Sequence, residues 1–170
     1  MTPNLREMGS LMVGIAIAGR LGSAIAAEIA TMVANDETDI LRFIGVDHFD
    51  YLVGPRVLAT ALSGMLLVLY ANALGLLGGL FTAVSVAGLP AQEFIDRARA
   101  VMGYKHAFSG LIKGFAFGTV TSIAACYHGL RSGRSAGAVG VTVRRAVVAA
   151  VVGVVLADVV ITLVFKWVRL

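Results

Sequence analysis

The chain has 170 residues, of which 58% are hydrophobic and only 14% are charged, and its formal net charge is +4. Soluble domains carry about a quarter charged residues, so this composition excludes an ordinary water-soluble domain and indicates a membrane protein. The basic residues are scattered between apolar runs, without the aromatic-interleaved basic patch of a nucleic-acid-binding protein. A single cysteine, Cys126, excludes a disulfide within the chain.

Four apolar runs are long enough to cross a bilayer, since a helix needs roughly 20 residues to span about 30 Å of hydrocarbon. The sequence therefore predicts an all-α, polytopic membrane helix bundle in a single domain, residues 1–170. We expect the spans at residues 9–34, 57–88, 106–129 and 146–165. The second run exceeds one straight crossing, so it either tilts or breaks near its glycines, which are Gly75, Gly78 and Gly79.

Three polar segments connect these runs. Residues 35–55 are amphipathic, and residues 89–105 have the spacing of an amphipathic helix outside the hydrocarbon. Residues 130–145 are rich in Gly and Ser and carry four arginines and no acid, Arg131, Arg134, Arg144 and Arg145. The positive-inside rule places 130–145 and 35–55 in the cytoplasm and 89–105 in the periplasm. Basic residues in 89–105 and after the last span argue for the opposite orientation.

The first span combines charge with very little side-chain bulk. Its stretch "IAIAGRLGSAIAAEIATM" carries Arg20 and Glu28 among Gly, Ala and Ser. These two charges are eight residues apart, or about 12 Å along a helix axis, so each needs another partner or water. Rows of small residues four apart let other helices approach closely, and the candidate packing residues are Gly19, Gly22, Ser23 and Ala26.

Two further charges lie inside later spans. Asp158 is in the last span, and Thr162 one turn onward is able to share its hydrogen bonding. Lys113 is close enough to the start of the third span to snorkel to the interface. Ionisable groups inside a membrane are costly when they face lipid, so Arg20, Glu28 and Asp158 are either functional groups in a wet cavity or structural ion pairs.

Five sequence blocks match one pattern in order and spacing. "LREMGSLMVGIAIAGRLGSAIAAEIATM" contains R-E-x-G followed by A-G-R-x-G-S-A-x-x-A-E-I-x-x-M, and "ILRFIGVDHFDYLVGPRVLA" contains V-D and then P-R-x-x-A. The others are "GLIKGFAFG", "CYHGLRSGRSAGAVGVTVRRAVV" and "LADVVITLVF". Together they resemble the MlaE (YrbE) family of ABC-transporter permeases. Family members usually carry an interfacial helix and one more span before the R-E-x-G block, which here lies almost at the first residue.

The resemblance implies a homodimeric permease subunit in a bacterial inner membrane that moves phospholipids or related lipids to or from the outer envelope. The partners it implies are a cytoplasmic ABC ATPase, a periplasmic MCE-domain protein and, in some systems, a STAS-domain subunit. The chain lacks a G-x-x-x-x-G-K-[ST] motif, so we expect no enzyme, no metal and no cofactor in it, with ATP and Mg²⁺ on the ATPase. Candidates for the lipid path are then Arg20, Glu28 and Asp158.

In the family, the polar segment after the A-E-I helix docks on the ATPase, and it corresponds to about residues 35–47 here. Acidic residues suit the start of a short helix, and Ile40, Leu41 and Ile44 form an apolar ridge that fits a groove. The candidate coupling residues are Asp36, Glu37, Asp39, Leu41, Ile44, Gly45 and Asp47. The family's D-P is Asp47-His48 in this chain, which bears on the details of the ATPase contact.

Alternative functions use the same residues differently. A proton-coupled secondary transporter or channel would use Glu28 and Asp158 as proton sites. A scaffold without transport is a third reading. We interpret Cys126 as an apolar packing residue and His128 as a histidine at the membrane interface. A metal site is disfavoured, because no further residues with metal-ligand spacing accompany this pair.

Overall fold

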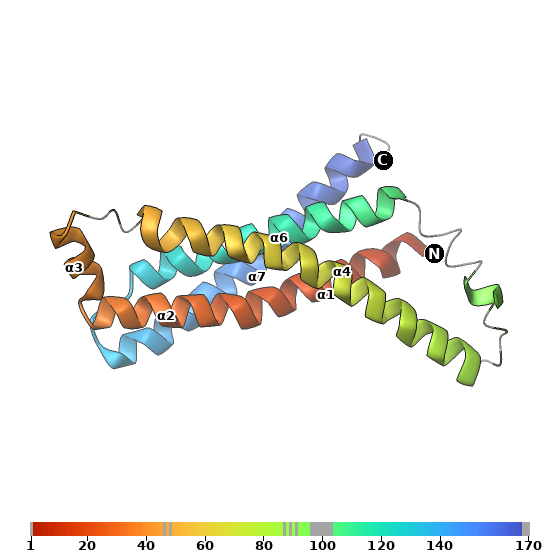
Figure 1. Cartoon of the computed structure of the whole chain (residues 1–170), viewed down its shortest axis with the longest axis horizontal. Coiled ribbons are helices and arrows are strands. Elements are labelled where there is room, and N and C mark those ends of the chain that lie inside the picture. Colours follow the sequence, from red (N-terminus) through yellow and green to blue (C-terminus); the bar gives the residue numbers. More distant parts are fainter. Residues whose placement is uncertain are drawn as a thin grey trace.

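The computed structural model describes residues 2–45, 47, 49–86, 88, 90, 92–95 and 104–167, and these residues are almost entirely helical (Figure 1). Four helical segments are long and apolar enough to cross a membrane, namely Gly9–Ala34, Tyr51–Ser85, Ser109–Leu130 and Ala136–Trp167. The predicted all-α polytopic bundle is therefore confirmed. In 89–105, residues 92–95 are helical, and most of the amphipathic helix expected there lies outside the described residues.

The first crossing is one rod made of three parts. Helix α1 (Thr2–Ile17) passes through a π-helical turn, η1 (Ala18–Gly22), into α2 (Ser23–Ala34). After the short helix α3 (Glu37–Phe43) and a second π-helical turn, η2 (Phe49–Val53), the chain returns along α4 (Gly54–Ser85). Helices α6 (Tyr104–Leu130) and α7 (Ala136–Trp167) complete the bundle.

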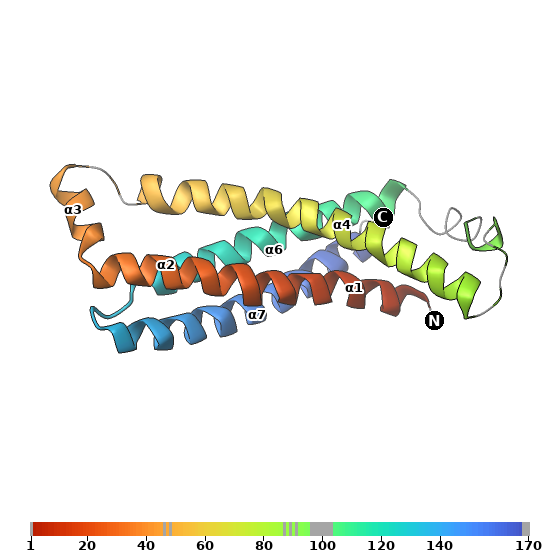
Figure 2. The same ribbon diagram turned by 60° about the horizontal axis from the view of Figure 1, so that its bottom comes forward.

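The bundle has two distinct ends (Figures 1 and 2). One end, hereafter the α3 end, carries α3, η2 and the α6–α7 turn, residues 131–135. The opposite end carries both chain termini, the end of α4 and the beginning of α6. Two segments that are far apart in sequence, the α2–α4 connection and the α6–α7 turn, are thereby brought together.

Helix α4 is continuous and does not break at its glycines. Pro55 occupies its first turn, where a missing N–H costs nothing. With 32 residues, α4 is roughly 48 Å long at 1.5 Å per residue, so it exceeds a perpendicular crossing. Its buried residues all lie in the first half, from Thr60 to Val68, and its second half diverges from the other helices in both views (Figures 1 and 2).

Helix α7 begins ten residues earlier than the expected span. Arg144 and Arg145 are therefore helical residues, and the predicted basic loop 130–145 is reduced to a short turn. Ser135 begins the helix, because its Oγ and carbonyl oxygen both accept from the N–H of Ala138, at 3.3 and 2.9 Å. Glycines in this stretch suggested a loop, but one helical face with a four-residue repeat is buried, comprising Thr142, Ala146, Ala150, Val154 and Asp158.

Helices α4 and α6 touch backbone to backbone. A Cβ atom on Gly118 would lie 2.3 Å from the carbonyl oxygen of Thr60, and one on Gly64 would lie 2.4 Å from the carbonyl oxygen of Gly114. Gly110, Gly114 and Gly118 recur every four residues along α6, which places them on one face. This is the small-residue crossing that membrane helices use where no bulky side chain separates their axes.

The rest of the core lies between the first crossing, α6 and α7. Ala18, Phe117, Ala150 and Val154 form one buried cluster. Toward the α3 end, a second cluster consists of Ala26, Ala125 and Ala146. The alanines let the three helices approach closely, and Phe117 is the largest fully buried side chain between them.

Candidate functional site

The most deeply buried charges form an ion pair between α6 and α7. Lys113 Nζ lies 2.8 Å from Asp158 Oδ1, and each side chain is only 8% exposed. Lys113 Nζ also donates a hydrogen bond to Thr162 Oγ1 at 2.9 Å. Asp158 Oδ1 accepts no hydrogen bond from the described residues, so its stabilisation comes from the ammonium charge. Lys113 does not snorkel as expected, because a carboxylate is available to it inside the bundle.

Glu28 has a partner on the second crossing. Arg56 Nη2 lies 3.0 Å from Glu28 Oε1, at the α3 end of the spans, and Arg56 also approaches the sulfur of Met32 at 3.9 Å. The Arg56 side chain is 19% exposed and that of Glu28 is 60% exposed. The partner that Glu28 was expected to need is thus the arginine of the P-R dipeptide that opens α4.

Arg20 occupies the π-helical turn η1 near the middle of the first span, and it is exposed on the single chain. None of the described residues pairs with its guanidinium group. The hydroxyl of Ser23 donates to the carbonyl oxygen of Arg20 at 3.0 Å, which satisfies one acceptor of the widened turn. A π-helical turn inside an α-helix is often associated with function.

The three candidate residues for a lipid path therefore lie in three places. Glu28 is paired at the α3 end, and Asp158 is paired between α6 and α7. Arg20 lies between these two pairs along the bundle, on the surface of the chain. The structure does not bring them into one site. Their involvement in a lipid path stays a prediction.

The chain turns sharply after α2, within two residues. Asp36 has a φ of +58°, a left-handed conformation that Asp and Asn tolerate better than other side chains. Its N–H donates to the carbonyl oxygen of Val33, and its own carbonyl oxygen accepts from the N–H groups of Asp39 and Ile40, which begins α3. Asn35 Nδ2 donates to Glu37 Oε1 at 3.2 Å. The acidic residues Asp36, Glu37 and Asp39 thus surround the N-terminus of α3, as the helix dipole favours.

The end of α3 is also defined by local chemistry. Gly45 has a φ of +77°, the left-handed conformation in which helices commonly end at glycine. Asp47 Oδ1 then accepts a hydrogen bond from the N–H of Phe49 at 2.9 Å, and the carbonyl oxygen of Asp47 accepts from the N–H of Tyr51. Gly45 and Asp47, two of the candidate coupling residues, shape the path from α3 into η2.

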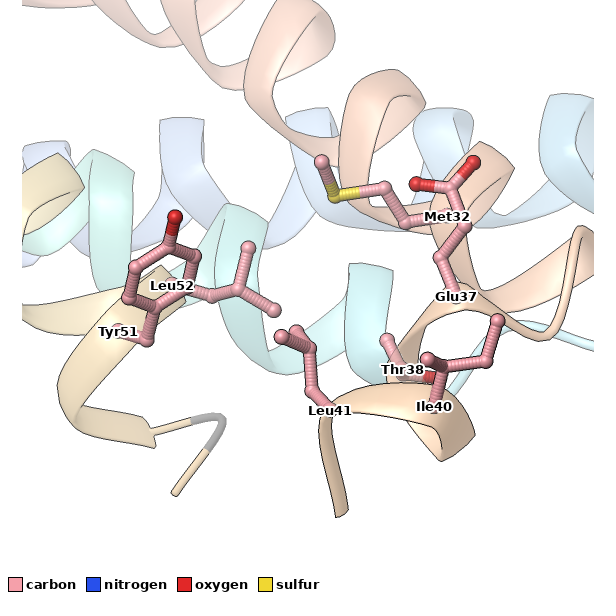
Figure 3. A pocket seen from close by; sticks show the side chains of 7 residues that line it. All are labelled: Met32, Glu37, Thr38, Ile40, Leu41, Tyr51 and Leu52. Carbon is pink, nitrogen blue, oxygen red and sulfur yellow. The ribbon is translucent and has the colours of Figure 1, made fainter. Parts of the chain in front are cut away.

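Helix α3 has an inner and an outer apolar face. A pocket of about 250 Å³ lies between α2, α3 and η2, and its lining consists of Met32, Glu37, Thr38, Ile40, Leu41, Tyr51 and Leu52 (Figure 3). Leu41 and Leu52 project toward one another across it (Figure 3). On the outer face, Ile44 is exposed and Phe43 is 92% exposed. Leu41 therefore packs within the chain. The outward apolar residues are Phe43 and Ile44, and Ile40 both lines the pocket and is exposed.

The predicted packing residues of the first span differ in their surroundings. A Cβ atom on Gly22 would lie 3.2 Å from Thr121 Cγ2, and Ala26 is fully buried against α6 and α7. Gly19 has no neighbouring atom within 4 Å of such a Cβ, and Ser23 bonds within its own helix. Close approach is therefore seen in the row of Gly22 and Ala26.

Four residues of these clusters were not among the predicted site residues. They are Arg56, Lys113, Phe43 and Arg134, the last of which bonds to Asp36 and Asp39 across the α3 end. The P-R dipeptide and the lone lysine in an apolar run were visible signals for the first two. Among the described residues, no group of three or more His, Cys, Asp or Glu side chains gathers as a metal site would require.

A four-span helix bundle with ion pairs between its helices and a helical projection at one end defines a polytopic membrane protein. The family model described as permease MlaE matches residues 2–164. The chain is 35% identical, over 95% of its length, to a "probable ABC transporter permease protein" of Rickettsia typhi. It is 34% identical, over 92% of its length, to the chloroplastic protein TRIGALACTOSYLDIACYLGLYCEROL 1 of Arabidopsis thaliana.

A similar permease of Synechocystis is 32% identical over 90% of the chain. The chain therefore belongs to the MlaE permease family, as the sequence blocks indicated. It spans 62% of the length of the Rickettsia typhi relative, 45% of the plant relative and 58% of the Synechocystis relative.

Proposed function

We propose that this chain is the transmembrane permease subunit of an ABC transporter that moves phospholipids or related lipids, driven by a separate ATPase. The observation that carries the proposal is the outer face of α3. Phe43 and Ile44 are exposed at the end of the bundle, beyond the spans, on a short helix whose own inner face is anchored by Leu41. Exposed apolar groups on such a projection fit a groove in a partner protein.

Membership of the MlaE permease family supports the transporter class, and relatives named ABC transporter permeases support the dependence on an ATPase. A lipid cargo is supported by the plant relative, which is named for trigalactosyldiacylglycerol, a glycolipid. The chain contains no nucleotide-binding motif of its own, so ATP and Mg²⁺ belong on the ATPase.

In the proposed mechanism, two copies of the permease enclose a lipid cavity, and each α3 rests on one ATPase. ATP-driven closure of the ATPases pushes α3, rocks the spans and expels the lipid. The α3 end then faces the cytoplasm of a bacterial inner membrane, and an MCE-domain protein receives or delivers lipid at the opposite end. A STAS-domain subunit is a further partner on the cytoplasmic side.

Reconstitution tests this function against the rival one. The chain is placed in phospholipid vesicles with or without a purified ABC ATPase that binds it, and transfer of a fluorescent phospholipid is followed. We expect transfer only with both the ATPase and ATP. Flux that needs a proton gradient and no ATPase would reject the proposal in favour of a secondary transporter using Glu28 or Asp158.

Phe43→Asp is expected to abolish copurification of the ATPase. A buried aromatic anchor typically contributes about 2 kcal/mol or more to an interface, so its loss weakens binding about 30-fold, and a carboxylate in an apolar groove adds to this cost. The measurement is the amount of ATPase retained on the tagged permease. Membrane insertion and thermal stability of the variant should remain normal, because Phe43 is 92% exposed.

Val86→Asp is the matched control, since Val86 is 80% exposed at the opposite end of α4. This variant should retain the ATPase. Leu41→Asp provides a second comparison, because Leu41 lines the pocket and its loss should loosen α3 as well as weaken binding. Full ATPase retention by Phe43→Asp would show that the outer face of α3 is not the docking surface.

A further inference from the structure

One guanidinium group ties α3 to a distant part of the chain. Arg134, in the α6–α7 turn, places Nε 3.1 Å from Asp36 Oδ1. Its Nη2 donates to Asp39 Oδ2. The two carboxylates flank the first residues of α3, so Arg134 holds the start of this helix from two sides. The sequence separation between Arg134 and Asp39 is 95 residues.

The α6–α7 turn that carries Arg134 is internally bonded. The N–H groups of Arg131 and Ser132 donate to the carbonyl oxygens of His128 and Gly129, which continue the end of α6. Ser132 Oγ accepts from Thr142 Oγ1 at 3.0 Å, and Ser135 begins α7. The backbone beside Arg134 is therefore fixed to both α6 and α7.

Apart from its bonds to Arg134, α3 is joined, among the described residues, to the first two crossings. It follows α2 through the two-residue turn at Asp36, and its inner face lines the pocket with η2, which leads into α4. No other ion pair joins α3 to the α6–α7 turn among the residues that the structure describes. The bonds of Arg134 thus join the two halves of the chain at the α3 end, where α3 and the α6–α7 turn both lie (Figure 1).

We propose that Arg134 is a positioning residue that makes α3 and the α6–α7 turn move as one unit. This inference rests on the proposed function, in which a partner ATPase pushes α3. A push on α3 alone would displace α2 and α4, whereas a push on the joined unit also displaces α6 and α7. All four crossings then respond together, as a rocking motion of the spans requires.

The effect should be on coupling and not on folding. Arg134 is 67% exposed, and Asp36 and Asp39 are 61% and 41% exposed. Ion pairs this exposed contribute little to global stability, because water competes for both partners. Their geometry is still specific, since a planar guanidinium fork presents separate N–H groups to two carboxylates.

Arg134→Gln is the test variant and Arg131→Gln is the matched control. Arg131 lies in the same turn and carries the same charge, but its guanidinium donates to the hydroxyl of Tyr127 and stacks 4.4 Å above that ring, within the α6 side of the turn. Hydrogen exchange of the purified chain in detergent is measured over residues 37–43. We expect exchange about threefold or more faster in Arg134→Gln and unchanged exchange in Arg131→Gln.

The functional readout is lipid transferred per ATP hydrolysed in the reconstituted complex. We expect this ratio to fall about fivefold or more in Arg134→Gln, with ATPase binding retained and with no loss in Arg131→Gln. The exchanged pair Arg134→Asp with Asp39→Arg should recover much of the ratio, because an arginine then again faces two carboxylates. Such recovery would not follow from a general loss of stability.

Unchanged exchange in α3 together with an unchanged transport ratio would overturn the inference. Loss of ATPase binding in Arg134→Gln with unchanged exchange would also overturn it, because Arg134 would then be a direct docking residue. If the wild-type chain shows no ATPase-dependent transport, the proposed function fails. Hydrogen exchange then still decides whether Arg134 holds α3.

Discussion

Gly118→Ala is expected to destabilise the bundle by about 1–3 kcal/mol, because the added methyl group has no room. Its Cβ would lie 2.3 Å from the carbonyl oxygen of Thr60 and 2.9 Å from the Cα of Ala61. Both neighbours are backbone atoms of α4, so no change of rotamer relieves the clash, and the helices must separate. The measurement is thermal or denaturant unfolding of the purified chain in detergent.

Gly75→Ala supplies the control for this substitution. Gly75 is on α4, where an added Cβ would meet no atom within 4 Å. Alanine is the better helix former by roughly 1 kcal/mol, so this variant should be neutral or more stable. The same chemical change is thus expected to have opposite signs at two glycines inside membrane helices. Equal effects at Gly75 and Gly118 would contradict the close α4–α6 contact.

Asp158→Leu is the second variant with a large expected effect. It leaves the ammonium group of Lys113 buried with only the hydroxyl of Thr162 as a partner. Removing one member of a buried ion pair typically costs about 3–5 kcal/mol, because the remaining charge is uncompensated. Lys113→Met should be destabilising for the corresponding reason. Both variants are compared with the wild type by unfolding in detergent.

The double variant Lys113→Met with Asp158→Leu separates a structural role from a functional one. Replacing both charges with apolar side chains of similar size is often neutral or stabilising, so most of the lost stability should return. If lipid transfer also returns, the pair is structural. If stability returns and transfer does not, the pair takes part in transport. A double variant less stable than either single one would refute the observed pairing.

The number and course of the spans could be predicted from the sequence because lipid leaves the backbone few options. Every N–H and C=O group inside the hydrocarbon must be bonded within the chain, so a long apolar run becomes a helix. The same argument explains why α4 stays helical through Gly75, Gly78 and Gly79. Glycine is better tolerated in membrane helices than in soluble ones. The early start of α7 at Ala136 has a different cause, the Ser135 cap and the buried face that begins at Thr142.

The partners of the charges could not be predicted in the same way. Whether Lys113 reaches the interface or Asp158 depends on how α6 and α7 pack, and hydropathy does not contain that information. The two faces of α3 were unresolved for a similar reason. A seven-residue helix with apolar residues on several sides does not reveal which of Leu41 and Phe43 faces the protein until η2 is in place.

The π-helical turn at residues 18–22 sets the rotational phase between the two halves of the first crossing. Gly14, before the turn, faces Val154 and Phe117, and Gly22, at its end, faces Thr121 and Ala150. An α-helix advances by 100° per residue, so winding the same residues as a regular α-helix would rotate one half by about that angle relative to the other. Gly14 and Gly22 would then no longer face α6 and α7 together. The widened turn thus absorbs one additional residue and keeps the two packing surfaces in register along one helix.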